Sequence, residues 1–248
     1  MGTYEILIFI GFCILSYLLG GVSVARMITK KENKGGINNQ GSGNPGTMNM
    51  LRTHGIGLGL LTLLCDALKG ALPALFGCLF FGDICDEQMG YLALYAFGLC
   101  AVLGHIFPLY HKFKGGKGIA TTFGVFMVAD PITSSILFAI MFLTLYVIKI
   151  GSVVSLLFVT IVAIVQLFRP CMDSNWVAIV LMLIIILLDI YAHRKNIERL
   201  VEDKENPADL HEGIKKDIQK LKKKKENINS EKQLDNVSKD EVVVENKE

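Results

Sequence analysis

A glycine- and lysine-rich segment, GHIFPLYHKFKGGKGIATTFG (residues 104–124), carries the clearest chemical pattern in the sequence. It places a GGKG turn (residues 115–118) between two apolar stretches. Glycines let backbone N–H groups approach an anion closely, and a helix that begins near Ile119 would direct its positive end there. Lys117 would add a full charge. The pattern predicts a phosphate-binding turn at a membrane surface, although an ordinary lysine-bearing cytoplasmic loop would also fit.

Two further polar clusters could contribute to the same site. One is the glycine- and asparagine-rich stretch QGSGNPGTMNMLRTHG (residues 40–55), which contains Arg52, and the other is HRKNIERL (residues 193–200). In a helix, His193 and Asn196 would share one face because they are three residues apart. Arginine can clamp a phosphate through two parallel N–H bonds, whereas lysine acts as a point charge. Serine, asparagine and histidine can orient a hydroxyl, so the clusters predict a site for a small phosphorylated, hydroxyl-bearing molecule.

Membrane-spanning helices are the elements that must position these clusters. Of the 248 residues, 52% are hydrophobic, the mean hydropathy is +0.46, and several apolar runs approach the ~20 residues that cross a bilayer. The net charge is only +2, since 25 Lys and Arg face 23 Asp and Glu, but these charged residues are crowded into loops and a C-terminal tail. The N-terminal MGTYEILIF lacks the basic region of a signal peptide, so we expect its apolar segment to remain as a span. The sequence therefore predicts an all-α integral membrane protein.

Seven apolar segments are expected to be transmembrane helices. The long run from Ile119 to Ile150 is divided at Asp130-Pro131, because proline cannot continue the helical hydrogen-bond ladder. The expected spans are Ile6–Ala25, about Ile56–Phe81, Tyr91 to about Pro108, Ile119 to the Asp130-Pro131 break, that break to Lys149, Ser152–Phe168 and Trp176–Tyr191.

The distribution of lysine and arginine sets the expected orientation. With seven spans, nearly all Lys and Arg outside the tail fall in loops on one side, and only Arg169 falls on the other. Six spans would instead place HRKNIERL and the lysine-rich tail outside, against the positive-inside rule. We therefore expect the N-terminus outside, the C-terminus in the cytoplasm, and all three polar clusters on the cytoplasmic face.

The six cysteines give no sign of a metal site. They form no CxxC pair, and most of them lie within apolar segments. We expect no metal and no cofactor. A disulfide between Cys85 and Cys171 stays open, since both fall in loops expected on the same side.

The composition changes from about Val201 onward. The tail is rich in Lys, Glu, Asp and Asn and has few apolar residues, so it cannot bury a core. We expect a membrane domain in residues 1–200 and a charged cytoplasmic tail in residues 201–248, disordered or loosely helical, which takes no part in the chemistry. The lysine-rich stretch from Lys215 to Lys225 could instead contact anionic lipid headgroups.

Three ionisable residues within the expected spans need separate interpretations. Asp66 and Lys69 are three apart on one helix, and charged groups in a span usually pair, so a structural ion pair is expected. A contact from Lys69 to the site is the alternative. His105 precedes the lysine-rich turn and could either act as a base or cap its span.

The three clusters resemble the cytoplasmic motifs of a known enzyme family. SGNPGTMNMLR, GHIFPLYHKFKGGKGIAT and HRKNIERL, in this order and spacing, are similar to the motifs of the acyl-phosphate-dependent glycerol-3-phosphate acyltransferases of bacterial membranes. DALKG followed by Pro73 also resembles that family's second span. The resemblance covers roughly residues 1–200. It implies seven spans, an outside N-terminus and a cytoplasmic active site.

The resemblance also implies an activity, its substrates and its site. A fatty acyl group would pass from acyl phosphate to the 1-hydroxyl of glycerol 3-phosphate, giving lysophosphatidic acid and phosphate, in the first acylation of phospholipid synthesis at the bacterial cell membrane. Membrane lipid would surround the enzyme; no nucleic acid is expected, and no protein partner can be inferred. The implied catalytic residues are Ser42, Arg52, Lys117, His193 and Asn196. The implied substrate- or phosphate-binding residues are Gly43, Asn44, Gly46, Asn49, Gly115, Gly116 and Gly118, with His105 and Lys69 as further candidates.

The chain departs from the family pattern in its first motif. The family usually has GATN where this chain has Gly46-Thr47-Met48-Asn49, so a hydroxyl at position 48 is lost or moved to Thr47.

Two other functional classes are alternatives. The other acyltransferase class uses an HxxxxD pair, and no histidine here has aspartate at that distance. In the resembling family the substrate phosphate is thought to accept the hydroxyl proton. The alternative function is a transporter of a phosphorylated small molecule. Two features argue against it: the sequence has no internal repeat, and the polar clusters are expected on one face of the membrane and not at its middle.

Overall fold

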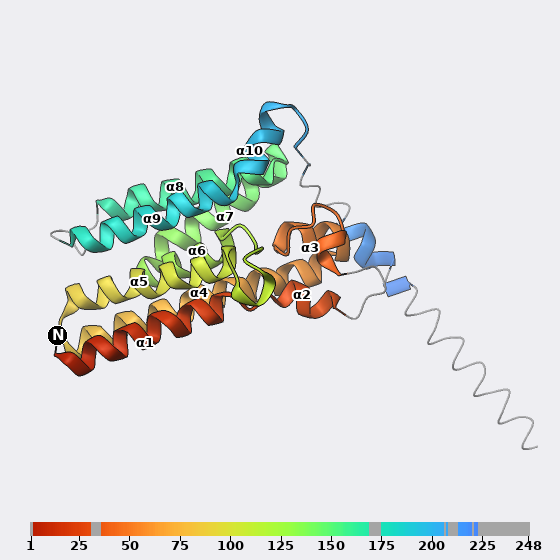
Figure 1. Cartoon of the computed structure of the whole chain (residues 1–248). Helices are drawn as coiled ribbons and strands as arrows, with labels where there is room; N and C mark the ends of the chain where they lie inside the picture. Colours follow the sequence, from red (N-terminus) through yellow and green to blue (C-terminus); the bar gives the residue numbers. More distant parts are fainter. Residues whose placement is uncertain are drawn as a thin grey trace, which may run out of the picture.

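The computed structural model describes residues 2–30, 36–168, 175–205, 207, 213–219 and 221–222. Within these ranges all regular secondary structure is helical, which confirms the predicted all-α fold (Figure 1). The α-helices are α1 (Thr3–Gly20), α2 (Val24–Thr29), α3 (Thr47–His54), α4 (Ile56–Ile84), α5 (Glu87–Ile106), α6 (Ile119–Ala129), α7 (Pro131–Ile148), α8 (Gly151–Leu167), α9 (Trp176–Ala192) and α10 (Arg194–Val201). Two short 3-10 helices, η1 (Ile37–Asn39) and η2 (Leu109–His111), lie in the loops.

The long helices form a bundle in which α4 and α5 are central. Helix α5 packs against α1, α4, α6 and α9, and α4 also packs against α3 and α6. The short helices α2, α3 and α10 gather at one end of the bundle, and the N-terminus lies at the opposite end (Figure 1). The three polar clusters of the sequence are therefore brought to a single end.

Each predicted span corresponds to a helix of the bundle. Four spans are long and apolar enough to cross a bilayer on their own: Thr3–Thr29, Ile56–Ile84, Glu87–His111 and Pro131–Ile148. The pair α9 and α10 meets the same test as one span with a 50° bend, whereas α6 and α8 are shorter apolar helices. At 1.5 Å per residue, α6 covers only ~16 Å, about half of the hydrocarbon core of a bilayer. A seven-span topology remains a prediction.

The break at Asp130-Pro131 lies where the sequence predicts it. Helix α6 ends at Ala129, and Pro131 occupies the first turn of α7, where a missing N–H is harmless. The Asp130 side chain caps α7 by accepting a hydrogen bond from the N–H of Thr133 at 3.2 Å. Helix α7 ends at Ile148, and Lys149 adopts a left-handed conformation directly after it.

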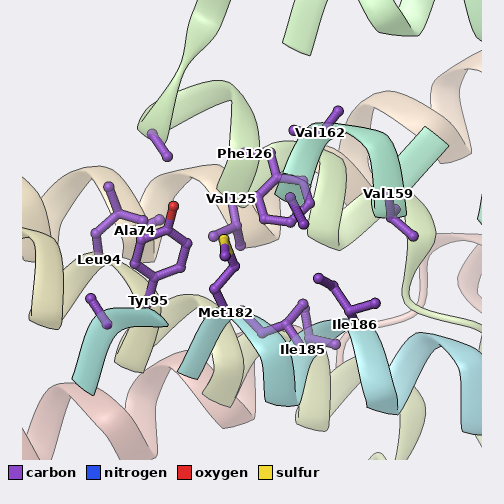
Figure 2. Close-up of a cluster of buried hydrophobic side chains, with 14 of the residues drawn as sticks. Ala74, Leu94, Tyr95, Val125, Phe126, Val159, Val162, Met182, Ile185 and Ile186 are labelled. Carbon is purple, nitrogen blue, oxygen red and sulfur yellow. The ribbon is translucent and has the colours of Figure 1, made fainter. Parts of the chain in front are cut away.

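A buried apolar core joins α4, α5, α6, α8 and α9. Figure 2 shows Tyr95, Phe126, Met182 and Ile185 among its buried side chains, all less than 2% exposed. Helix α6 also approaches α4 very closely, since a Cβ on Gly124 would lie 1.9 Å from the carbonyl oxygen of Ala67. Small residues allow such close packing in membrane helices, and here they fix the helix that begins at the GGKG turn.

The cysteines of the described residues are free thiols: Cys13, Cys65, Cys78, Cys85 and Cys100. Cys171 lies outside the described residues, and so does the pairing with Cys85 that the sequence left open.

Candidate active site

One cavity brings the three predicted clusters together at the end of the bundle that carries α3 and α10. Its empty space, the open mouth included, is about 1190 Å³. The predicted residues that line it are Ser42, Asn44, Gly46, Asn49, Arg52, His105, Lys117, Gly118, His193 and Asn196. Among the described residues, the predicted Gly43, Gly115, Gly116 and Lys69 do not line it.

The first cluster is a loop held against the start of α3 by Asn49. This buried side chain accepts a hydrogen bond from the N–H of Ser42 at 2.9 Å and donates one to the carbonyl of Gln40 at 2.9 Å. Because both ends of its amide bind the backbone, Asn49 positions Ser42 at the cavity. Arg52 follows on the same helix, one turn further along, and also lines the cavity.

The second cluster folds differently from the expectation of a phosphate-binding GGKG turn. The N–H of Gly115 donates to the carbonyl of Ile106 at 3.0 Å, and the N–H of Gly116 donates to the carbonyl of His105 at 3.0 Å. Both amides are thus occupied by the end of α5, which leaves them unable to cradle a phosphate in this conformation. The turn instead serves to present Lys117 at the cavity.

The start of α6 brings backbone amide groups to the cavity. Gly118, Ile119 and Ala120 line the cavity, and the first N–H groups of a helix have no intrahelical acceptor. They concentrate positive partial charge at that point. Gly118 has φ +91°, and a Cβ there would lie 2.2 Å from Oδ1 of the wholly buried Asp189 of α9. Glycine is therefore required at this position on both counts.

The third cluster lies at the bend between α9 and α10. His193 is 1% exposed, and its Nδ1 lies 2.7 Å from the carbonyl oxygen of Asp189. Because a carbonyl only accepts, Nδ1 carries the proton and Nε2 is the nitrogen left for a ligand. Asn196 lies one turn later and donates from Nδ2 to Oε1 of Glu205 at 2.5 Å.

Three residues that the sequence analysis did not propose also line this cavity: Ser152, Arg199 and Glu205. The Glu205 carboxylate accepts hydrogen bonds from Ser152 Oγ at 3.1 Å and from Arg199 Nε at 3.0 Å, besides the one from Asn196. The spacing of His193, Asn196 and Arg199 by three residues could have revealed the arginine. Glu205 was assigned to the tail, so the part of the chain that builds the cavity extends beyond the predicted boundary at residue 200.

The charges of the cavity influence one another. Burial lowers the pKa of Lys117 to about 8, the cations Arg199 and Arg52 act in the same direction, and Glu205 opposes them. Burial disfavours the charged form of Glu205, but hydrogen bonds from Asn196 and Arg199 outweigh it and hold the Glu205 pKa below its ordinary value. Glu205 is therefore ionised at neutral pH, and it offsets part of the positive charge around Lys117.

Two cationic side chains, Arg26 and Lys69, link segments that are distant in the sequence. Arg26 of α2 donates from Nη2 to the carbonyl of Lys114 at 2.5 Å and from Nε to Oδ1 of Asn38 at 3.3 Å. Lys69 lies 2.8 Å from Asp66 and donates to the carbonyl of Val22 at 3.0 Å. Arg26 thereby links the loop of the first cluster to that of the second, and Lys69 links α4 to the turn after α1.

The environment of His105 favours its structural interpretation over a role as base. Its carbonyl holds Gly116, its Nδ1 lies 3.8 Å from Asp66, and its Nε2 packs under the same glycine turn. The ion pair between Asp66 and Lys69 is present as predicted.

One wall of the cavity is apolar. It is formed by side chains of α4, α7 and α8, which are buried or half-buried except for Leu60, which is 47% exposed. The members of this apolar wall are Leu60, Leu63, Phe138, Met141, Phe142, Leu145 and Val154.

The chain is similar to proteins of one enzyme family. A sequence profile described as glycerol-3-phosphate acyltransferase matches residues 10–203. Proteins named glycerol-3-phosphate acyltransferase from Finegoldia magna and Syntrophotalea carbinolica are each 36% identical to this chain. The first match covers 82% of this chain and 97% of the relative, and the second covers 77% and 93%.

Solved structures of PlsY, an integral membrane glycerol 3-phosphate acyltransferase, are also similar. The glycerol 3-phosphate form has a TM-score of 0.70 and 31% identity, over 80% of this chain and 94% of that chain. The lysophosphatidic acid form has a TM-score of 0.69 and 30% identity.

Proposed function

This chain belongs to the glycerol-3-phosphate acyltransferase family, and we propose that an acyl phosphate is its acyl donor. It is an integral membrane acyltransferase of phospholipid synthesis. The products would be lysophosphatidic acid and inorganic phosphate. One observation carries the proposal: a single cavity is lined both by the cations Arg52, Lys117 and Arg199 and by an apolar wall. Such a cavity suits a molecule with a phosphate at the end of an acyl chain.

The proposed topology has seven crossings, with the cavity facing the cytoplasm of a bacterial cell. The N-terminus lies at the end of the bundle opposite to α3 and α10 (Figure 1). Residues of α3 and α10 line the cavity, and the same end carries the lysine- and arginine-rich loops. Loops with excess Lys and Arg stay in the cytoplasm. The short α6 packs against α4, α5 and α8 as well as α7, so neighbouring helices and not lipid cover most of it.

The reaction needs two anions to be held together in a site that excludes bulk water. The 1-hydroxyl of glycerol 3-phosphate attacks the carbonyl carbon of the donor, the bond from that carbon to the phosphate oxygen breaks, and phosphate leaves with the bonding electrons. Arg52 and Lys117 bind the phosphates, and they and the start of α6 stabilise developing negative charge. The hydroxyl proton passes to the phosphate of glycerol 3-phosphate, and an acyl phosphate already has a good leaving group, so no covalent enzyme intermediate is needed.

Three side chains are proposed to orient the attacking hydroxyl: Ser42, His193 and Asn196. Each is fixed by a contact to the protein that leaves another of its polar atoms for the substrate: Asn49 holds the Ser42 backbone, Asp189 holds His193 Nδ1 and Glu205 holds Asn196 Nδ2. The apolar wall holds the acyl chain next to them. Positions fixed in this way lower the entropy cost of reaching the transition state.

The donor is tested by incubating the detergent-solubilised protein with glycerol 3-phosphate and either palmitoyl phosphate or palmitoyl-CoA. We expect lysophosphatidic acid to form at least tenfold faster from palmitoyl phosphate, with one inorganic phosphate released per product. Efficient turnover with palmitoyl-CoA and none with palmitoyl phosphate would contradict the proposed donor. Turnover with neither, together with uptake of glycerol 3-phosphate into proteoliposomes, would favour a transporter.

The pKa of Lys117 predicts how the reaction depends on pH. This pKa is lowered to about 8, and only the cation binds phosphate well, so binding weakens as pH rises through that value. Phosphate monoesters have a second pKa near ~6 and stay dianionic throughout. We expect kcat/KM for glycerol 3-phosphate to fall above about pH 8, approaching tenfold per pH unit.

Lys117→Arg is the matched control for this pH profile, because guanidinium keeps its proton throughout the range. The fall above about pH 8 should disappear or move upward in this variant, even if its rate is lower. An identical profile in both proteins would assign the titration to another group.

A further inference from the structure

The predicted tail contains a short helix that docks onto the membrane domain. Residues 213–219 and 221–222 are helical and are called the tail helix below. Asp217 accepts hydrogen bonds from the N–H groups of Ile56 at 2.7 Å and Gly57 at 3.3 Å, the first residues of α4. A carboxylate in this position satisfies otherwise unpaired amides and complements the positive end of the helix. The sequence left open whether the tail is disordered or loosely helical, and this part of it is helical.

Two further contacts fix the same face of the tail helix. The Lys216 ammonium donates to the carbonyl of Arg52, at the end of α3. Gly213 is buried, and a Cβ on it would lie 3.1 Å from the Leu51 side chain and 3.2 Å from that of Ile56. In Figure 1 the tail helix lies beside α3, at the end of the bundle with the cavity. The docked face thus consists of residues near Gly213 and Asp217.

The tail helix also carries an exposed apolar stripe. Ile214, Ile218 and Leu221 are 42%, 48% and 67% exposed, and their spacing of four and three places them on one face. By helical geometry this stripe lies about a quarter turn from the docked face, and Lys215 and Lys222 follow about a quarter turn beyond it. Both lysines are exposed. An apolar stripe flanked by lysines is the pattern of a helix that lies in a membrane interface.

The exposure of α4 side chains indicates where the docked helix would lie relative to a bilayer. Leu61 and Leu64 of α4 are 42% and 56% exposed, as lipid-facing side chains are. Ile56, which Asp217 caps, precedes Leu61 by five residues, or ~7.5 Å along the helix. The headgroup region on each side of a bilayer is ~5–8 Å thick. A helix fixed at Ile56 therefore lies where its stripe can reach the acyl chains.

We propose that the tail helix is a binding surface for anionic membrane lipid. Ile214, Ile218 and Leu221 insert below the headgroups, and Lys215 and Lys222 remain among the lipid phosphates. Asp217 and Lys216 fasten the helix to α3 and α4 from the side. The profile of the family ends at residue 203, so this surface lies outside the part of the chain shared with the family.

The test places a tryptophan on the stripe of the full-length protein in vesicles. The single natural tryptophan, Trp176, is first replaced by phenylalanine. Ile218→Trp reports on the stripe, and Gln219→Trp is the control because the neighbouring residue points away from it. Vesicles contain lipids brominated near the top of the acyl chains, either phosphatidylcholine alone or with phosphatidylglycerol. We expect quenching of Ile218→Trp to exceed that of Gln219→Trp at least twofold, and more strongly with phosphatidylglycerol present.

Two additional variants keep the experiment decisive. Leu221→Trp should repeat the result from a second stripe position, which guards against undocking by one substitution. Lys215→Gln combined with Lys222→Gln should remove the extra quenching in phosphatidylglycerol, while acyltransferase activity confirms that each protein is folded. Unquenched stripe tryptophans, whether solvated or covered by a protein, would overturn the proposal. Equal quenching in both vesicles would reject an anionic surface as the partner.

Discussion

Lys117→Ala is expected to lower kcat/KM for glycerol 3-phosphate roughly thirty- to a thousandfold while the protein stays folded and inserted. Lys117 lines the cavity beside Arg52 and Arg199, and burial already shifts its pKa. Losing a charge-assisted contact to a partly desolvated phosphate costs ~2–4 kcal/mol. The measurement is steady-state kinetics with palmitoyl phosphate, with thermal unfolding of the purified variant as the check on folding.

Two companion variants separate a phosphate site from a general positive field. Arg52→Ala should have an effect of the same size, and Arg52→Lys should restore it only in part, since an ammonium lacks the two-pronged geometry of guanidinium. Lys112→Ala, on the same loop but exposed and outside the cavity, should cost less than about tenfold. Equal losses in all three alanine variants would indicate a general field. Near-normal activity of Lys117→Ala would exclude the GGKG lysine from the site.

The helices were predictable from the sequence because their causes are local. Apolar runs of sufficient length predict membrane helices, and Asp130-Pro131 ends one helix and starts the next through the chemistry of those two residues. The convergence of the three clusters at one end was also predictable, because spans of alternating direction bring every second loop to the same side. Arg52, Lys117 and His193 accordingly meet at one cavity.

The roles within the clusters depended on contacts between distant segments, which spacing does not reveal. Glycines 115 and 116 looked like anion donors, yet their amides bind carbonyls at the end of α5. Asn49 looked like a substrate ligand, yet both ends of its amide hold the loop before α3. In each case the residue types indicated groups that form specific hydrogen bonds. Only the fold shows that these hydrogen bonds are made to the protein backbone and not to a substrate.

Composition misled the interpretation of the chain after α10. A stretch rich in charge and poor in apolar residues predicts disorder because it cannot bury a core. That argument does not consider single charged residues that form hydrogen bonds or ion pairs with the membrane domain. Glu205 binds Arg199 and Asn196, and Asp217 caps α4, and neither contact requires a core.

Glu205→Ala is expected to lower kcat at least thirtyfold, through the loss of the contact that fixes Asn196. The Glu205 side chain is only 8% exposed, and it joins Arg199 and Asn196 of α10 to Ser152 at the start of α8. Removing one partner of a buried ion pair costs ~3–5 kcal/mol, and the 35% exposure of Arg199 places this pair below that range. The same substitution removes a negative charge near the phosphates, which favours anion binding at a pH low enough for Lys117 to keep its proton, because Glu205 also raises the Lys117 pKa.

The two effects of Glu205→Ala separate in the kinetic constants. Loss of positioning lowers kcat, whereas loss of the nearby negative charge lowers KM for glycerol 3-phosphate or leaves it unchanged. Glu205→Gln keeps an acceptor for Asn196 and Ser152 without the charge, so it should retain more of kcat than alanine does. Glu202→Gln is the matched control: Glu202 pairs with Lys204 at 3.1 Å where both side chains are more than half exposed, and such pairs contribute little. A raised KM with normal kcat in Glu205→Ala would show that the carboxylate organises substrate binding and not the attacking hydroxyl.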